Sequence, residues 1–179
     1  MAVASVTLFF ALLAVFAVVG STAVGLSAIG GDRLGLRAAV APVGIELAAA
    51  VSVIATAGSL YLSEVAGFQP CLLCWVQRAF MYPGAVLLPL AVILRTRWPA
   101  VIAAGLAAPG LVVALFHRYE QSVGGGAGFC DPTVPCTVRW VNHFNVVTIP
   151  TMAAAGFVAV AVLVAVSVWN PAADMPSGG

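Results

Sequence analysis

The sequence contains no lysine, and only 7% of its 179 residues carry a charged side chain. A water-soluble domain of this length could not cover its surface with so few charges, so the composition excludes an ordinary soluble protein. The net charge is +1 and no run of basic residues occurs, which argues against a nucleic-acid partner. What remains is mostly apolar, because 63% of the residues are hydrophobic.

Five apolar runs are each long enough to cross a membrane. About 20 apolar residues in a helix span ~30 Å of hydrocarbon. Each run must be helical in lipid, because an unpaired backbone amide costs several kcal/mol there. We therefore predict an all-α integral membrane protein with spans at about residues 3–29, 43–63, 74–94, 99–117 and 146–169.

The first run, 3–29, also has the position of a signal peptide. However, no positively charged segment precedes it, and it is longer than the apolar region of such a peptide. We expect an additional anchoring helix.

The arginines predict the orientation of the spans. Four of them lie in two short loops, and cytoplasmic loops are the ones enriched in arginine: Arg33, Arg37, Arg95 and Arg97. The loops at about 64–73 and 118–145 should then face the outside, together with the N-terminus. Two further arginines in the second outer loop weaken this bias: Arg118 and Arg139.

The four cysteines fall in pairs on the predicted outer side, at Cys71 and Cys74 in the first outer loop and at Cys130 and Cys136 in the second. Disulfides form and persist outside the cytoplasm. An even number of cysteines, with one pair in each loop, suggests two disulfides.

Three interpretations of these cysteines compete. The cysteines could form structural disulfides, but a Cys-x-x-Cys ring closes too short a loop to stabilise a protein much, and it is a common redox motif. The four cysteines could bind one zinc ion, but the five residues between Cys130 and Cys136 depart from the usual short spacing of zinc ligands. The two pairs could exchange electrons by thiol–disulfide exchange, which needs only that they lie close together. The glycine-rich segment "GGGAGF" before Cys130 would let the second pair approach the first, which favours exchange.

Arg78 gives the first pair a further feature. If Cys74 begins a helix, Arg78 lies one turn later on the same face, just inside the membrane boundary. A charge there is costly and is more often functional than not, although an arginine can also extend to the lipid headgroups. A cation favours the thiolate of Cys74 and can stabilise a carbonyl that gains negative charge on reduction. A quinone is such a lipid-soluble, two-electron acceptor.

Other polar residues lie at the same level. His117, at the end of the fourth span, is a candidate proton donor to a reduced quinone, or else an ordinary interfacial histidine. Gln77 is a candidate hydrogen-bond donor to a quinone, or else a polar residue without a role. No role is assigned to His143. Three aromatic residues are interpreted as interfacial or packing positions: Trp75, Phe80 and Tyr82.

At this point the residues match a known family. The segments "PCLLCWVQR" followed by "MYP", "ALFHRYEQ", "CDPTVPC" and "TIPTMAAAGFVAVAVLV" resemble the DsbB-type disulfide bond formation proteins, particularly the BdbC-like branch of Gram-positive bacteria. The resemblance covers about residues 43–168. It implies a four-helix transmembrane bundle, which we expect at 43–170. The apolar runs and the arginines predict the rest, an extra N-terminal transmembrane helix and cytoplasmic loop at 1–42 and a cytoplasmic tail at 171–179.

The resemblance also implies a function. Such a protein lies in the bacterial cytoplasmic membrane with its cysteine loops outside, oxidises a thioredoxin-fold, DsbA-like thiol oxidase, and passes the electrons to quinone. The cofactor would be menaquinone or ubiquinone. By resemblance, Cys71–Cys74 is the quinone-coupled pair, with Cys74 nearer the ring. Cys130–Cys136 is the pair that meets the partner, with Cys130 as its target.

The same resemblance assigns a quinone contact to Arg78 and a place near the quinone to His117. The first span has no counterpart in the four-helix pattern. The short second outer loop leaves the order of the disulfide rearrangements open.

Two alternatives remain. A quinone-coupled bundle similar to vitamin K epoxide reductase would carry its Cys-x-x-Cys after the loop pair, and here the order is reversed. A non-enzymatic membrane protein would use its cysteines as structural disulfides or as a metal site.

Overall fold

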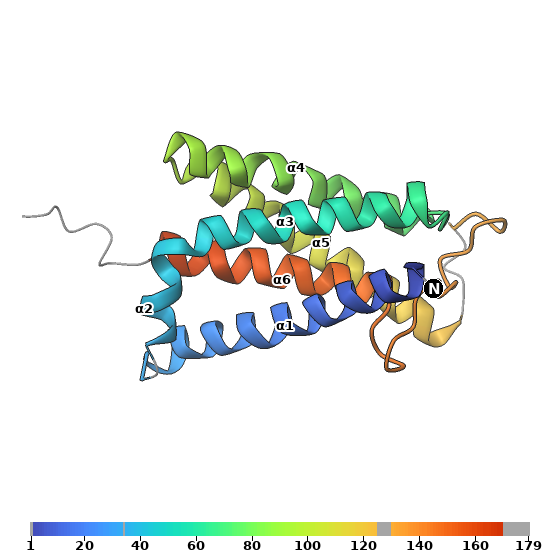
Figure 1. Ribbon diagram of the computed structural model, residues 1–179, viewed down its shortest axis with the longest axis horizontal. Coiled ribbons are helices and arrows are strands. Elements are labelled where there is room, and N and C mark those ends of the chain that lie inside the picture. Colours follow the sequence, from blue (N-terminus) through green and yellow to red (C-terminus); the bar gives the residue numbers. More distant parts are fainter. Residues whose placement is uncertain (1, 34, 125–129, 170–179) are drawn as a thin grey trace, which may run out of the picture.

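The computed structural model describes residues 2–33, 35–124 and 130–169 (Figure 1). Within these ranges the chain is helical and forms no strand beyond a single bridge between His143 and Val147. The helices, with a 3-10 turn (η1) and a π-helical turn (η2), are α1 (Ala2–Gly30), α2 (Leu36–Val40), η1 (Ala41–Val43), α3 (Gly44–Leu60), η2 (Tyr61–Val65), α4 (Leu72–Leu94), α5 (Trp98–Val123) and α6 (Ile149–Val168).

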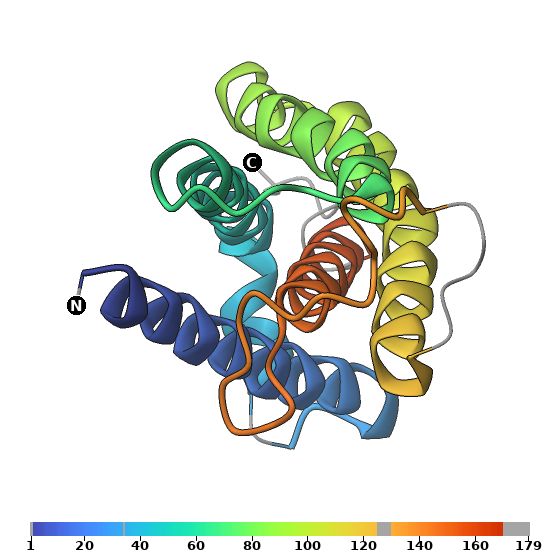
Figure 2. The same cartoon turned by 90° about the vertical axis from the view of Figure 1, so that its right-hand side faces the viewer.

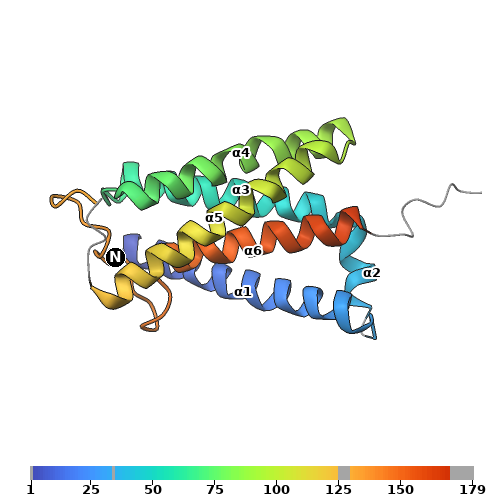
Figure 3. The same cartoon turned by 180° about the vertical axis from the view of Figure 1, so that it is seen from behind.

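In the described part of the chain, 5 helical stretches are long and apolar enough to cross a membrane, which confirms the predicted fold class. Helices α3 to α6 form a four-helix bundle in which α3 packs on α4 and α6, and α5 packs on the same two helices. Helix α1 lies outside this bundle against α6, and α2 links its far end to α3 (Figures 1 and 3). Viewed from one end, α6 lies between α1, α3 and α5 (Figure 2).

Small residues let these helices approach closely, as membrane helices require when lipid offers no hydrophobic driving force. The buried core of the bundle is mostly alanine, with Leu88, Phe157 and Leu163 among its larger members. At Gly110 in α5, an added Cβ would lie 2.5 Å from the ring of Phe157. Glycine therefore allows the close approach of α5 and α6 at this crossing.

Several element boundaries differ from the predicted spans. Helix α5 continues to Val123, so His117 lies within the helix and not at its end. Helix α6 begins at Ile149 and has Pro150 in its first turn, where the missing amide hydrogen costs no helical hydrogen bond. The predicted cytoplasmic loop contains α2. The predicted tail 171–179 lies outside the described residues.

The start of α4 positions the first cysteine pair. Gly67 has φ 71° and turns the chain after η2. Cys71 is the extended N-cap residue of α4, and its carbonyl accepts the first helical hydrogen bond from the Trp75 amide at 3.1 Å. Cys74 therefore lies in the first turn of the helix.

Two arginines bind the end of α6 at the end of the bundle opposite the cysteines. Arg37 donates to the Trp169 carbonyl at 2.9 Å, and Arg97 donates to the Val168 carbonyl at 3.5 Å. These bonds hold the arginine-containing connections against the last turn of α6.

Candidate active site

The segment between α5 and α6 contains a disulfide between Cys130 and Cys136. The two cysteines differ in exposure, because Cys136 is only 2% exposed and Cys130 is half-buried. Within the ring they close, the Asp131 carboxylate accepts hydrogen bonds from the Thr133 hydroxyl at 2.7 Å and from its amide at 2.8 Å. These bonds lower the pKa of Asp131 and fix the turn between the cysteines. The glycine-rich segment that was predicted to allow movement of this pair lies largely outside the described residues.

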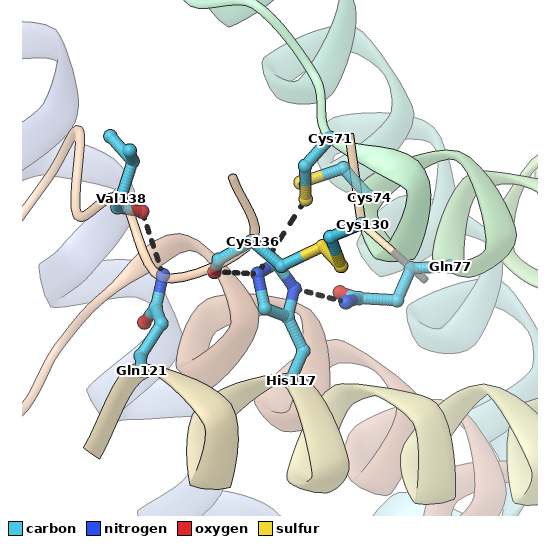
Figure 4. The surroundings of a disulfide bond; sticks show 8 residues. All are labelled: Cys71, Cys74, Gln77, His117, Gln121, Cys130, Cys136 and Val138. Atoms are coloured by element: carbon cyan, nitrogen blue, oxygen red, sulfur yellow. Dashed lines mark hydrogen bonds between the residues drawn. A yellow bond between two sulfur atoms is a disulfide. The ribbon is translucent and has the colours of Figure 1, made fainter. Parts of the chain in front are cut away.

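Cys71 and Cys74 are free thiols whose Sγ atoms lie 3.1 Å apart, within hydrogen-bond distance. Cys71 is buried in a small apolar cluster with Cys136 and Leu73, and Cys74 and Cys130 pack against this cluster. The fold thus brings the two cysteine pairs, which are more than fifty residues apart in sequence, into one cluster (Figure 4).

His117, from the interior of α5, joins the two pairs (Figure 4). Its Nε2 lies 3.0 Å from the carbonyl oxygen of Cys136 and 3.7 Å from Sγ of Cys71. Its Nδ1 lies 2.8 Å from Nε2 of Gln77. A carbonyl can only accept and an amide nitrogen can only donate, so this network requires the neutral tautomer with its proton on Nε2. Gln77 therefore fixes the orientation of the imidazole that faces both pairs.

The thiol of Cys71, just outside α4, is tuned by these neighbours. The side-chain hydrogen bond with Cys74 is the largest influence and lowers the pKa of Cys71 from 9.0 to about 4. Burial raises this pKa, and the hydrogen bond with His117 lowers it. Cys71 is therefore the thiolate of the reduced pair, the form that attacks or leaves in disulfide exchange.

Arg78 is buried one turn after Cys74, and Ser59 of α3 holds it in place. Its Nε donates to the Ser59 hydroxyl at 3.0 Å, and its Nη2 donates to the Ser59 carbonyl at 2.9 Å. Its guanidinium carbon lies 5.0 Å from the centre of the Trp75 ring, a cation–π contact. Among the described residues, no carboxylate pairs with the Arg78 guanidinium, so its positive charge is not neutralised by an ion pair.

A cavity of about 610 Å³ opens beside these groups. Cys74, Gln77 and Arg78 line its end nearest the cysteines, and Phe68 and Trp140 line it there too. These two aromatic rings stack with their centres 5.3 Å apart. Most of the remaining lining is apolar and comes from α1, α3 and α6.

Further hydrogen bonds attach the segment after Cys136 to the bundle. Gln121 of α5 donates to the Val138 carbonyl at 3.0 Å, and Arg139 donates to the Gln121 carbonyl. His143, which had no predicted role, lies 3.0 Å from the hydroxyl of Thr7 in α1. This segment is thereby fixed to both α5 and α1.

The structure thus gathers all seven predicted site residues at one end of the bundle. Sequence reasoning missed Ser59, which holds Arg78, and Thr7, which contacts the segment after Cys136. Neither belongs to a motif, and nothing in the sequence pairs Ser59 with a residue nineteen positions later. Trp75 had been interpreted as an interfacial or packing residue, and it also contacts Arg78.

Fold and site together define a helical membrane protein with two adjacent cysteine pairs, one of them oxidised. The model of the family described as "Disulfide bond formation protein DsbB" matches residues 42–169. The chain therefore belongs to the DsbB family, is a multi-pass membrane protein, and has a role in disulfide bond formation. Helix α1 lies outside the matched region.

Curated relatives agree with this assignment and confirm the resemblance to the BdbC-like branch. "Probable disulfide formation protein C 1" of Bacillus anthracis is 43% identical over 113 residues, which cover 62% of this chain and 81% of the relative. "Disulfide bond formation protein C" of Bacillus subtilis (strain 168) is 37% identical over 110 residues, covering 60% and 80%. "Probable disulfide formation protein" of Deinococcus radiodurans is 42% identical over 95 residues, covering 53% and 59%. No solved structure gives a significant match.

Proposed function

We propose that the protein is a thiol:quinone oxidoreductase that reoxidises an extracytoplasmic, thioredoxin-fold thiol oxidase. The observation that carries this proposal is that the loop disulfide, the second cysteine pair and an apolar cavity are in direct contact. The Cys130–Cys136 disulfide packs against Cys71, His117 contacts both pairs, and Cys74 lines an apolar cavity beside Arg78. Residues 43–170 would form the catalytic unit.

The cavity fits a quinone by its chemistry. Its lining is apolar along most of its length, and its polar groups include a reactive sulfur and a buried arginine whose contacts leave its charge available. A quinone bound there supplies a lipid-soluble acceptor for two electrons and two protons. Arg78 would donate a hydrogen bond to the ring carbonyl and stabilise negative charge on that oxygen. A donor that is already held in position stabilises such a charge more strongly in an apolar cavity than in water. Menaquinone and ubiquinone both present such a carbonyl.

The first step we propose takes place at the exposed side of the site. A thiolate of the reduced partner attacks Sγ of Cys130, the bond to Cys136 breaks, and Cys136 leaves as a thiolate. The second partner thiolate then attacks the mixed disulfide and releases Cys130 as a thiol. Exposure supports this order, since Cys130 is half-buried and Cys136 is buried. The partner leaves oxidised, and the loop pair gains two electrons and two protons.

The second step moves the electrons inward. Cys136, beside Cys71 in the same cluster, attacks the oxidised Cys71–Cys74 disulfide, and Cys130 resolves the resulting bond. The loop disulfide is restored and the membrane pair is reduced, which is the arrangement in the structure. Cys74 then lies against the cavity, where the two electrons leave the protein.

His117 and Gln77 would act on the inward step. The Nε2–H of His117 can stabilise a thiolate on Cys71 while holding the backbone of Cys136 in place. Gln77 contacts His117 and also lines the cavity, so it is a positioning residue for the imidazole as well as a candidate quinone contact.

The proposal includes the membrane in which the protein lies and the side that its cysteines face. The arginine distribution supports an orientation in which the cysteine end lies on the outer face of a bacterial cytoplasmic membrane. There a DsbA-like partner and the membrane quinone both reach the site.

A metal site is the second candidate, and one observation favours it. The sulfurs of Cys71 and Cys74 and a ring nitrogen of His117 lie within 4.8 Å of one another. However, both nitrogens of His117 already hold hydrogen bonds, to Cys136 and to Gln77. Ligation would have to break one of them, so the redox function is favoured.

One experiment separates the two candidates. Purified protein is supplied with a small dithiol and a quinone in the presence of a strong chelator, and quinone reduction is followed by absorbance. We expect turnover that chelation leaves intact and that Cys74→Ser abolishes. Stoichiometric zinc in the purified protein, together with no turnover, would instead establish the metal site.

A further inference from the structure

We propose that α1 forms one wall of a pocket that holds the isoprenoid chain of the quinone and thereby sets the affinity for long-chain quinones. This inference rests on the proposed function and deepens it. It gives a role to a helix that lies outside the region shared with the family, residues 42–169.

The cavity runs along α1 for several turns. Eight residues of this helix line the cavity, and five of them recur at helical spacing on one face: Phe10, Ala14, Ala17, Gly20 and Val24. From Phe10 to Val24 the helix rises about 20 Å at 1.5 Å per residue. The facing walls come from α3, between Leu47 and Gly58, and from α6, between Met152 and Leu163. The cavity is thus an elongated space parallel to the helices, long enough for several isoprene units.

The polar groups of the cavity point to the occupant. Cys74, Gln77 and Arg78 lie at the cysteine end, and Ser59 lines the same end from α3. Towards the other end the lining is apolar except for Ser21. A molecule with a redox-active polar ring and a long apolar chain matches both parts at once. The acyl chain of a phospholipid matches only the apolar part and makes no use of the cysteine.

Two glycines keep this space open. Gly20 of α1 and Gly156 of α6 both line the cavity, and a Cβ added to either would meet no atom within 4 Å. Glycine within a helix costs about 0.5–1 kcal/mol relative to alanine. This differs from Gly58, where an added Cβ would lie 2.8 Å from the ring of Phe10. Gly58 allows close packing, whereas Gly20 and Gly156 leave volume.

The outer turn of α1 is tied to the catalytic end of the molecule. Thr7 contacts His143, which follows the Cys130–Cys136 pair, and the ring of Phe10 covers Gly58 at the end of α3. Helix α1 is therefore fixed beside the reactive end of the cavity, and its position relative to the proposed ring site is set by these contacts.

The test compares two quinones that share a ring, one with a long prenyl chain and one without a chain. The measured quantity is kcat/KM for each quinone, with a small dithiol as electron donor. The comparison uses the ratio of kcat/KM for the prenylated quinone to kcat/KM for the chainless quinone. In Gly20→Leu the new side chain should occupy the volume of the prenyl chain, so this ratio should fall about tenfold. Gly156→Leu should act in the same direction from the opposite wall.

Gly105→Leu is the matched control. Gly105 lies exposed on α5, does not line this cavity, and has no atom within 4 Å of an added Cβ. Its ratio should stay at the wild-type value. If Gly20→Leu does not accumulate, Ala14→Leu fills the pocket from the same helix.

The outcomes distinguish a failure of the proposed α1 wall from a failure of the proposed quinone-reducing function. A wild-type protein that reduces neither quinone contradicts the proposed function and the inference with it. A wild-type protein that reduces both, with an unchanged ratio in the α1 variants, overturns the α1 wall and leaves the function standing. A fall confined to Gly156→Leu would place the chain against α6 without α1, and an equal fall in Gly105→Leu would show that the pocket is not the cause.

Discussion

The imidazole Nε2 of His117 donates a 3.0 Å hydrogen bond to the backbone carbonyl of Cys136. One residue of α5 thus holds the loop that carries one cysteine pair, while the same nitrogen lies 3.7 Å from Cys71 of the other. The coupling between the two pairs therefore depends on how this ring is oriented.

His117→Ala should slow electron transfer between the pairs about tenfold or more, because it removes a donor to the Cys71 thiolate and a bond to the loop. Gln77→Leu has nearly the same size but leaves Nδ1 without its partner, so it should slow the same step by a smaller factor. The measurement is the rate at which Cys71–Cys74 becomes reduced after the loop pair is reduced in a rapid-mixing experiment. A His117→Ala rate equal to that of wild type would reduce the histidine to an ordinary packing residue.

The pH dependence of Cys71 follows from its lowered pKa. Because the pKa is lowered to about 4, the thiolate should persist as the pH falls and should be lost only near that value. Cys74→Ala removes the hydrogen bond that is the largest cause, so the loss of thiolate should move to higher pH. Ultraviolet thiolate absorbance of the reduced protein across a pH titration measures both. A wild-type titration centred near the ordinary value of 9.0 would contradict the assigned network.

Arg78→Ala should raise KM for quinone about 10- to 100-fold, since a hydrogen bond to a charged group contributes about 1.5–3 kcal/mol. Both disulfides should still form, because neither cysteine pair relies on the guanidinium for its geometry. Arg78→Lys keeps the charge but loses the planar fork that Ser59 holds, so it should recover activity only in part.

Ser59→Ala provides the finer test of the same site. It removes the hydroxyl acceptor but leaves the carbonyl that binds Nη2, so its effect on KM should be smaller than that of Arg78→Ala. Unchanged quinone kinetics in Arg78→Ala would favour an arginine that only extends towards the headgroups.

Gly110→Ala should destabilise the bundle by about 1–3 kcal/mol, because its Cβ would lie 2.5 Å from the ring of Phe157 and overpack the crossing. Gly105→Ala, on the same helix in open space, is the matched control and should be neutral or slightly stabilising. Thermal unfolding in detergent measures both. Equal unfolding temperatures for the two variants would show that the α5–α6 contact adapts easily.

The sequence predicted the membrane class, the five spans and the family, because apolar run length and a distinctive cysteine motif are local signals. The ends of helices were less predictable. The charged and polar residues after His117 suggested a loop, yet α5 continues through Glu120 and Gln121, whose side chains are buried, and Gln121 donates to the Val138 carbonyl in the segment after Cys136. Helix extension here depends on a tertiary contact that hydropathy does not report.

The site shows the same division. The spacing of four residues between Cys74 and Arg78 was enough to place both on one face of a helix. The bond from Gln77 to His117 joins α4 and α5, and the contact of Thr7 with His143 joins segments 136 residues apart. Such contacts depend on how the helices are arranged around one another. The space beside α1 likewise follows from packing, since the glycines that leave it open look like any others in the sequence.

The most direct test of the account is quinone reduction driven by a reduced thioredoxin-fold partner, compared with reduction driven by a small dithiol. Wild-type protein should use both donors, and Cys74→Ser should use neither. Cys130→Ser should lose the partner-driven reaction, while the small dithiol should still drive turnover by attacking the half-buried Cys74. This pattern would establish a relay that runs through the loop pair, the membrane pair and the quinone in that order. Partner-driven turnover at the wild-type rate in Cys130→Ser would contradict it.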